Sequence, residues 1–182
     1  TILLALWHVR EVAPKEVPRL HIFGSDDNYG SPNMGMPGTG YEQFLKGLSK
    51  RLGLDDRIIW HGIKSKEYLE AEVLSKPFTF ISASLHSDED FGVSAFRSLE
   101  RGNKAILSLW GGHIDLARNF RNQTQAVRVE GSDLGPFVSP ISLGEEILKC
   151  LTKTPARPSR VPPPLDKYKY ASYRRHLNKV MK

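Results

Sequence analysis

Short apolar runs alternate along the chain with segments whose apolar residues recur at helical spacing. Apolar runs of about four to eight residues bounded by glycine or proline are typical of buried strands, and recurrence at i, i+3 and i+4 is typical of amphipathic helices. Strands and helices that alternate in this way predict an α/β fold with a parallel sheet. We expect strands at residues 20–23, 58–60, 78–83, 105–109 and 126–129, and helices at residues 1–12, 41–52, 66–74, 94–99, 114–120 and 143–151.

Three segments depart from this alternation. Residues 25–40 hold four glycines and two prolines, which predicts a surface loop. Five prolines fall within residues 155–164, which is typical of an extended, semi-rigid linker. The last segment, residues 166–182, has three tyrosines among basic residues, which predicts a basic helix. We therefore divide the chain into a globular domain at residues 1–154, a linker at residues 155–165 and a C-terminal helix at residues 166–182.

Charge is distributed unevenly between these parts. The chain has a net charge of +6, but residues 153–182 contribute +8 from nine Lys or Arg and one Asp, so residues 1–152 carry −2. A nucleic-acid-binding protein would place basic groups on the fold itself, so we expect no nucleic acid partner. The tail could instead contact an anionic membrane surface. Cys150, the only cysteine, fits a reducing compartment, and we expect a cytoplasmic protein that reaches a membrane only peripherally.

The stretch from Phe78 to Gly112 holds the candidate chemistry. An apolar strand leads into the acidic turn that ends at Gly92, a helical segment follows, and a second strand ends at Gly111-Gly112. In a parallel sheet, the loop that leaves the first strand opens onto the crevice where ligands bind, and the next helix points its free N–H groups there. Glycine allows the backbone to approach a ligand, and Glu89 can accept hydrogen bonds from sugar hydroxyls. This pattern suits a sugar phosphate.

The same residues resemble a known family. Glu89-Asp90-Phe91-Gly92-Val93, with Gly102 ten residues after Gly92 and then Gly111-Gly112, is similar to the donor-binding half of the retaining GT-B glycosyltransferases of group 1. The resemblance covers residues 1 to about 153. It implies a Rossmann-like domain with helices on both faces of the sheet, a nucleotide-sugar donor, no cofactor and no catalytic metal.

The resemblance also implies roles for particular residues. Glu89 would act as the catalytic residue that binds the transferred sugar. The loop after the third strand would face the nucleobase. The donor-binding residues would be Asp90, Phe91, Gly92, Val93, Ser94, Arg97, Gly62 and Ile63. Asp88-Glu89-Asp90 also has the Asp-x-Asp spacing of metal-dependent glycosyltransferases, but Glu89 already has a place in the GT-B pattern.

Arg97 departs from the family, which has a second glutamate at this position. A carboxylate would accept hydrogen bonds from ribose hydroxyls, whereas a guanidinium only donates and prefers phosphate or carboxylate. Arg97 therefore either binds a donor phosphate or marks a chain that has lost donor binding. A structural alternative is an ion pair between Arg97 and Glu100, three residues later on the same helix.

The second departure is a missing first strand. In the family this domain begins with a strand and a loop whose Arg and Lys hold the donor diphosphate, immediately before the helix that corresponds to residues 1–12, and these elements are absent from this sequence. That strand would lie between residues 20–23 and 78–83. We expect these two strands not to pair directly, and we expect another polypeptide or upstream residues to supply the missing strand.

Two functions follow as hypotheses. The chain is the donor-binding part of a retaining glycosyltransferase, inactive without its acceptor-binding half, or it is a degenerate glycosyltransferase-like subunit that binds a partner without catalysis. An intact Glu89 turn favours the first, whereas Arg97 and the absent first strand favour the second. The sequence does not specify the sugar, the base or the acceptor.

Overall fold

Strands and helices alternate along the chain, as the hydrophobic pattern predicts. The structure is a computed structural model that describes residues 1–26, 40–85 and 92–152. Its elements, in order, are α1 (Ile2–Val12), η1 (Pro14–Glu16), β1 (Leu20–Phe23), α2 (Tyr41–Arg51), η2 (Asp55–Arg57), β2 (Ile58–Gly62), α3 (Lys66–Tyr68), the π-helical η3 (Leu69–Val73), β3 (Thr79–Ser82), α4 (Val93–Glu100), β4 (Lys104–Ser108), α5 (Gly112–Asn119), β5 (Thr124–Val127), β6 (Val129–Ser132), β7 (Gly135–Val138) and α6 (Pro140–Thr152).

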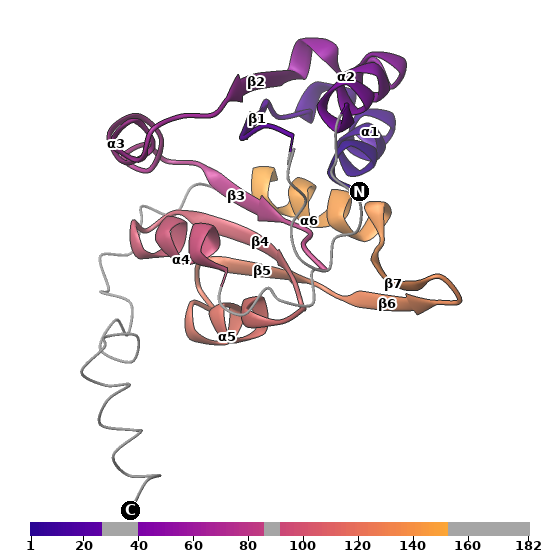
Figure 1. Ribbon diagram of the computed structural model, residues 1–182. Helices are drawn as coiled ribbons and strands as arrows, with labels where there is room; N and C mark the ends of the chain where they lie inside the picture. Colours follow the sequence, from indigo (N-terminus) through magenta and orange to yellow (C-terminus); the bar gives the residue numbers. More distant parts are fainter. Residues whose placement is uncertain (27–39, 86–91, 153–182) are drawn as a thin grey trace, which may run out of the picture.

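The strands form two parallel sheets and one hairpin. β1 pairs with β2, and β3, β4 and β5 pair in that order, all in parallel. β6 and β7 form an antiparallel hairpin. From the top of Figure 1 downward, the strands follow as β2, β1, β3, β4 and β5.

Helices cover both faces of the three-stranded sheet, because successive residues of β4 point to opposite faces. Ala105 and Leu107 pack with residues of α4 and α5, whereas Ile106 packs with residues of α1 and α6. α1 and α6 lie against each other so closely that a Cβ on Gly144 would be 2.9 Å from the carbonyl oxygen of Ala5. This arrangement confirms the predicted α/β, Rossmann-like fold with helices on both faces.

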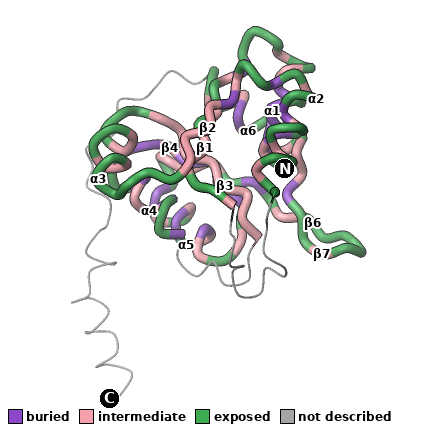
Figure 2. The backbone as a smooth tube through the Cα atoms, turned by 45° about the horizontal axis from the view of Figure 1, so that its top comes forward, coloured by how far each residue is buried: buried purple, intermediate pink, exposed green. Residues whose placement is uncertain are grey.

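β1 and β3 do not pair in the part of the chain that the structure describes. β3 is apolar at Phe80 and Ile81, yet each of its four residues is only half-buried, whereas residues 105–108 of the neighbouring β4 are fully buried (Figure 2). β3 therefore has the sequence of an interior strand and the burial of an edge strand. The expectation that these strands would not pair directly is confirmed, and the source of a strand between them stays a prediction.

Other predictions meet the structure in different ways. The hairpin β6–β7, which is mostly exposed (Figure 2), was not predicted; only a strand at 126–129 was expected. The predicted helix at 66–74 is a short α-helical turn that continues as a π-helix. Most of the predicted loop at 25–40, the linker at 155–165 and the basic helix at 166–182 lie outside the described residues.

Candidate functional site

Gly92 begins the helix at the centre of the predicted site. Its φ of +67° and ψ of 55° are left-handed, a conformation that favours glycine. The first helical hydrogen bond of α4 runs from the Phe96 N–H to the Gly92 carbonyl at 2.9 Å, so the helix itself does not use the amides of residues 93–95. Val93 and Ser94 are exposed, which leaves this helix start accessible. Glu89, Asp90 and Phe91, together with Asp88, lie outside the described residues.

A second helix start lies beside the first. Gly111 precedes α5 and lies three residues after the end of β4, and the His113 ring in the first turn of α5 is 1% exposed. A Cβ built on Gly92 would lie only 2.9 Å from Cδ2 and 3.2 Å from Nε2 of His113. The starts of α4 and α5 are therefore in contact through the imidazole of His113.

His113 is also joined to the ends of two strands. Its Nδ1 lies 3.2 Å from the hydroxyl of Ser108, the last residue of β4. Ser108 donates to the backbone carbonyl of Ser84, just beyond β3, at 2.7 Å. The contact holds the carboxyl ends of β3 and β4 and the beginnings of α4 and α5 together. Nothing in the sequence around His113 predicts that it belongs to this site.

Arg97 forms an ion pair, but not with the predicted partner. Its guanidinium lies 3.3 Å from the carboxylate of Glu70 in η3, and Arg101 contacts the other oxygen of the same carboxylate. The alternative pair of Arg97 with Glu100 is thus replaced by a contact across 27 residues. Since η3 lies between β2 and β3, Glu70 links that segment to the outer face of α4.

Gly62 and Ile63 lie at the end of β2, in the other parallel sheet. Gly62 has φ +65°, and its carbonyl accepts a hydrogen bond of 3.0 Å from the Gly24 amide. Ile63 is 77% exposed. These residues follow a strand end, as predicted, but no hydrogen bond among the described residues joins them to the Gly92 turn.

His61, next to Gly62, belongs to a small aromatic group that the sequence pattern does not predict. Its Nε2 lies 2.9 Å from Nδ1 of His21 on the neighbouring strand, and its ring stacks on Phe23 with centroids 4.3 Å apart. Burial lowers the pKa of His61, and the charges of His21 and Lys64 lower it further. In the parallel pair, His21 lies beside Ile59, and His61 is two residues further along on the same face of the sheet. With this register, the sequence spacing brings the two histidines together.

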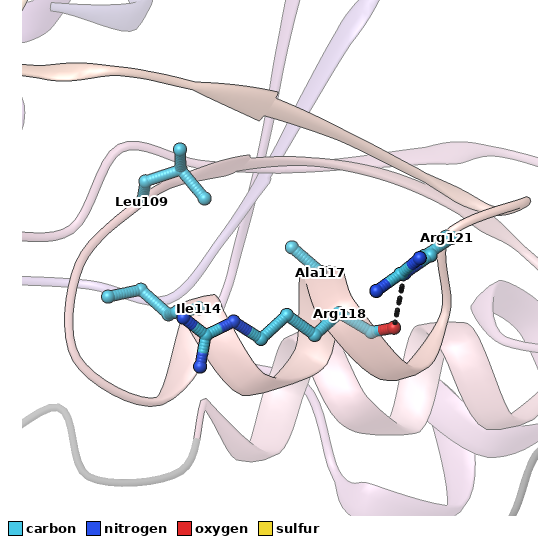
Figure 3. A pocket seen from close by; sticks show the side chains of 5 residues that line it. All are labelled: Leu109, Ile114, Ala117, Arg118 and Arg121. Atoms are coloured by element: carbon cyan, nitrogen blue, oxygen red, sulfur yellow. Dashed lines mark hydrogen bonds between the residues drawn. The ribbon is translucent and has the colours of Figure 1, made fainter.

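A shallow cavity of about 440 Å³ lies beside α5, between this helix and Leu109 (Figure 3). Two arginines border its apolar residues, and Arg121 Nε donates to the backbone carbonyl of Arg118 at 3.2 Å. The predicted donor-site residues do not line this cavity, which is formed by Leu109, Ile114, Ala117, Arg118 and Arg121. Among the described residues there is no group of three or more His, Cys, Asp or Glu side chains that could hold a metal ion, and no described helix has the length and apolarity needed to cross a membrane.

Comparison with known proteins places the fold. No protein-family model and no curated protein match the sequence. Among solved structures, the chain is similar to WaaG, described as a glycosyltransferase involved in lipopolysaccharide biosynthesis, with a TM-score of 0.58 and 15% identity. The match covers 84% of this chain and 34% of that chain, so this chain spans about one third of the length of WaaG. The chain therefore shares the α/β, Rossmann-like fold of about one third of WaaG.

Proposed function

We propose that this chain is the donor-binding part of a retaining glycosyltransferase, which transfers a sugar from a nucleotide-sugar to an acceptor hydroxyl. The observation that carries the proposal is the start of α4: a left-handed Gly92, then exposed residues whose amides the helix does not use, in a fold shared with a glycosyltransferase. Amides at a helix start, together with the positive end of the helix dipole, stabilise anionic oxygens such as those of a sugar diphosphate.

The individual roles follow from the resemblance. Glu89 would accept hydrogen bonds from the hydroxyls of the transferred sugar, and the amides of Phe91, Gly92 and Val93 would bind sugar or phosphate oxygens. Asp90 and Ser94 would border the same ligand. The backbone of Gly62 and Ile63 would face the nucleobase, which requires the end of β2 to lie across the ligand from Gly92.

Catalysis would need more than these 182 residues. A retaining enzyme of this kind holds the donor between two domains, stabilises the leaving diphosphate electrostatically and admits the acceptor hydroxyl on the same face of the sugar. The basic residues that hold the diphosphate and the acceptor-binding half are supplied from elsewhere in this proposal. The chain by itself should bind donor weakly and transfer no sugar.

Calorimetry on the full protein tests the proposal with UDP-glucose, GDP-mannose and ADP-glucose as probes. We expect one probe to bind, and we expect Glu89→Gln to weaken that binding by roughly ten- to a hundredfold, because hydrogen bonds to a charged group contribute about 1.5–3 kcal/mol. Glu130→Gln, at an exposed position of β6, is the control and should leave the affinity unchanged. The proposal is wrong if none of the probes binds to the unmodified protein.

One observation favours the second function, a glycosyltransferase-like subunit that binds a partner without catalysis. The Arg97 guanidinium contacts Glu70 rather than an open ligand site. In Arg97→Glu combined with Glu70→Gln, the family's carboxylate is restored without placing two carboxylates side by side. A tighter Kd for the bound nucleotide-sugar would support a ribose site at this position. Binding without transfer in both proteins would support the non-catalytic function.

A further inference from the structure

The buried hydrogen bonds of Ser108 define a nitrogen of His113 that carries a proton. The Ser108 hydroxyl has one proton, and it donates this proton to the Ser84 carbonyl, which can only accept. The Ser108 oxygen must then accept from His113, so Nδ1 of His113 carries a proton. In the neutral ring the other nitrogen, Nε2, is an acceptor, and this nitrogen is on the edge that faces Gly92.

We propose that His113 is a positioning residue for the donor site: through the Ser84–Ser108–His113 chain it holds Gly92 so that the free amides at the start of α4 face the ligand. This inference rests on the function proposed above. Gly92 leaves no room for the ring to move closer, since a single added carbon would already meet it. Both ring and hydroxyl are 1% exposed, so water cannot replace either hydrogen bond.

The location of the chain explains why a buried polar group is used here. β3 and β4 end side by side, and Gly92 and Gly111 directly precede α4 and α5, the helices that follow these strands. Apolar packing alone fixes such positions poorly, because glycine has no side chain to pack. The His113 ring is held by its hydrogen bond to Ser108 at the end of β4, and it packs against Gly92, so it defines where Gly92 lies relative to both strands.

Three variants separate positioning from simple packing. His113→Phe keeps a ring of similar size but removes the donor to Ser108, and Ser108→Ala removes the acceptor. His113→Asn keeps a donor near the position of Nδ1 and should restore function. Ser49→Ala is the matched control, since Ser49 is also fully buried and donates to a backbone carbonyl, that of Lys46, but in the distant helix α2.

The first measurement needs no ligand. In the full protein we expect hydrogen exchange of the Phe96 amide, which bonds to the Gly92 carbonyl, to accelerate roughly three- to tenfold in His113→Phe and Ser108→Ala, the effect of losing one ordinary hydrogen bond. Ser49→Ala should leave this exchange unchanged, and nitrogen NMR should show the proton of His113 on Nδ1. Unchanged Phe96 exchange in both site variants would overturn the proposal.

The second measurement is the Kd for whichever of UDP-glucose, GDP-mannose and ADP-glucose the unmodified protein binds. We expect the Kd to rise about three- to tenfold in His113→Phe and Ser108→Ala and to recover in His113→Asn. If all three probes fail to bind while Phe96 exchange still responds, the proposed function fails and the structural role of His113 stands. A probe that binds all variants equally shows that His113 does not position the donor site.

Discussion

At the scale of single residues, Gly92 is constrained in two independent ways. Its left-handed φ of +67° is unfavourable for any residue with a Cβ, and the His113 ring lies only 2.9 Å from the place where that Cβ would be. Removing the His113 ring would not change the left-handed conformation of Gly92, so relief of the steric constraint leaves the conformational constraint in place. The two effects can therefore be measured separately.

Gly92→Ala should lower the free energy of unfolding by about 1–2 kcal/mol from the left-handed conformation alone, and further through the collision with His113. In a His113→Ala background the collision disappears and only the conformational part remains. Denaturant unfolding of the four proteins in this cycle measures the coupling. Gly47→Ala is the control: Gly47 lies within α2 with open space around it, so alanine should stabilise the protein by roughly 0.5–1 kcal/mol. Additive effects of the two site substitutions would contradict the contact.

The His21–His61 pair leads to a prediction about pH. Burial, His21 and Lys64 all lower the pKa of His61, so the folded protein binds its proton less tightly than the unfolded chain does. The contribution of His61 to stability is therefore complete above the pKa of an unperturbed histidine and declines as the pH falls through it. An NMR titration should show His61 below the ordinary histidine value, and His21→Gln should raise its pKa. An unchanged His61 pKa in that variant would contradict the coupling between the rings.

At the scale of elements, the sequence predicts those parts whose periodicity comes from burial. β1 was predicted with its observed bounds, and the other four strands and the helices within a few residues, because most of these elements bury one face or both faces against the core. The hairpin β6–β7 was missed because it is largely exposed and so lacks that signal, with Leu134 fully exposed at its turn. Contacts between elements were the least predictable: nothing local identifies Glu70 as the partner of Arg97, or Ser108 as that of His113.

One such contact ties the beginning of α2 to the end of β1. The Asp26 carboxylate accepts hydrogen bonds from the amides of Gly40 at 2.9 Å and Glu42 at 2.7 Å, so it caps α2 from fourteen or more residues away in sequence. Asp26→Ala should cost roughly 0.5–2 kcal/mol of unfolding free energy, as loss of a helix cap does. Asp26→Asn, which keeps one acceptor, should cost less. Hydrogen exchange at Phe44, whose amide bonds to Gly40, reports whether the loss is local to this helix.

At the scale of the whole molecule, charge separates the chain into two parts that should behave differently. Residues 153–182 carry +8 and residues 1–152 carry −2. We expect the full chain to bind phosphatidylserine vesicles and a chain ending at residue 152 not to bind, since each basic residue near an anionic surface contributes about 1 kcal/mol. Binding should weaken as salt rises from about 0.1 M to about 1 M, where the screening length falls to roughly 3 Å. Phosphatidylcholine vesicles are the control, and equal binding to both lipids would exclude an electrostatic tail.

The two parallel sheets lead to the last prediction, because the free edges of β1 and β3 leave backbone groups without strand partners in the described part of the chain. Burial of these backbone N–H and C=O groups without hydrogen-bond partners would be costly. If water solvates them instead, the apolar strand β3 stays half-buried, as observed. A parallel strand between β1 and β3 removes both problems, whether upstream residues or another polypeptide supply it. When the polypeptide that carries this strand is present, exchange of the β3 amides that do not bond to β4 should slow by at least about tenfold, while exchange in β6–β7 stays the same. Equal exchange at β3 with and without that polypeptide would show that the space between the sheets is closed by side chains and that β3 is a true edge.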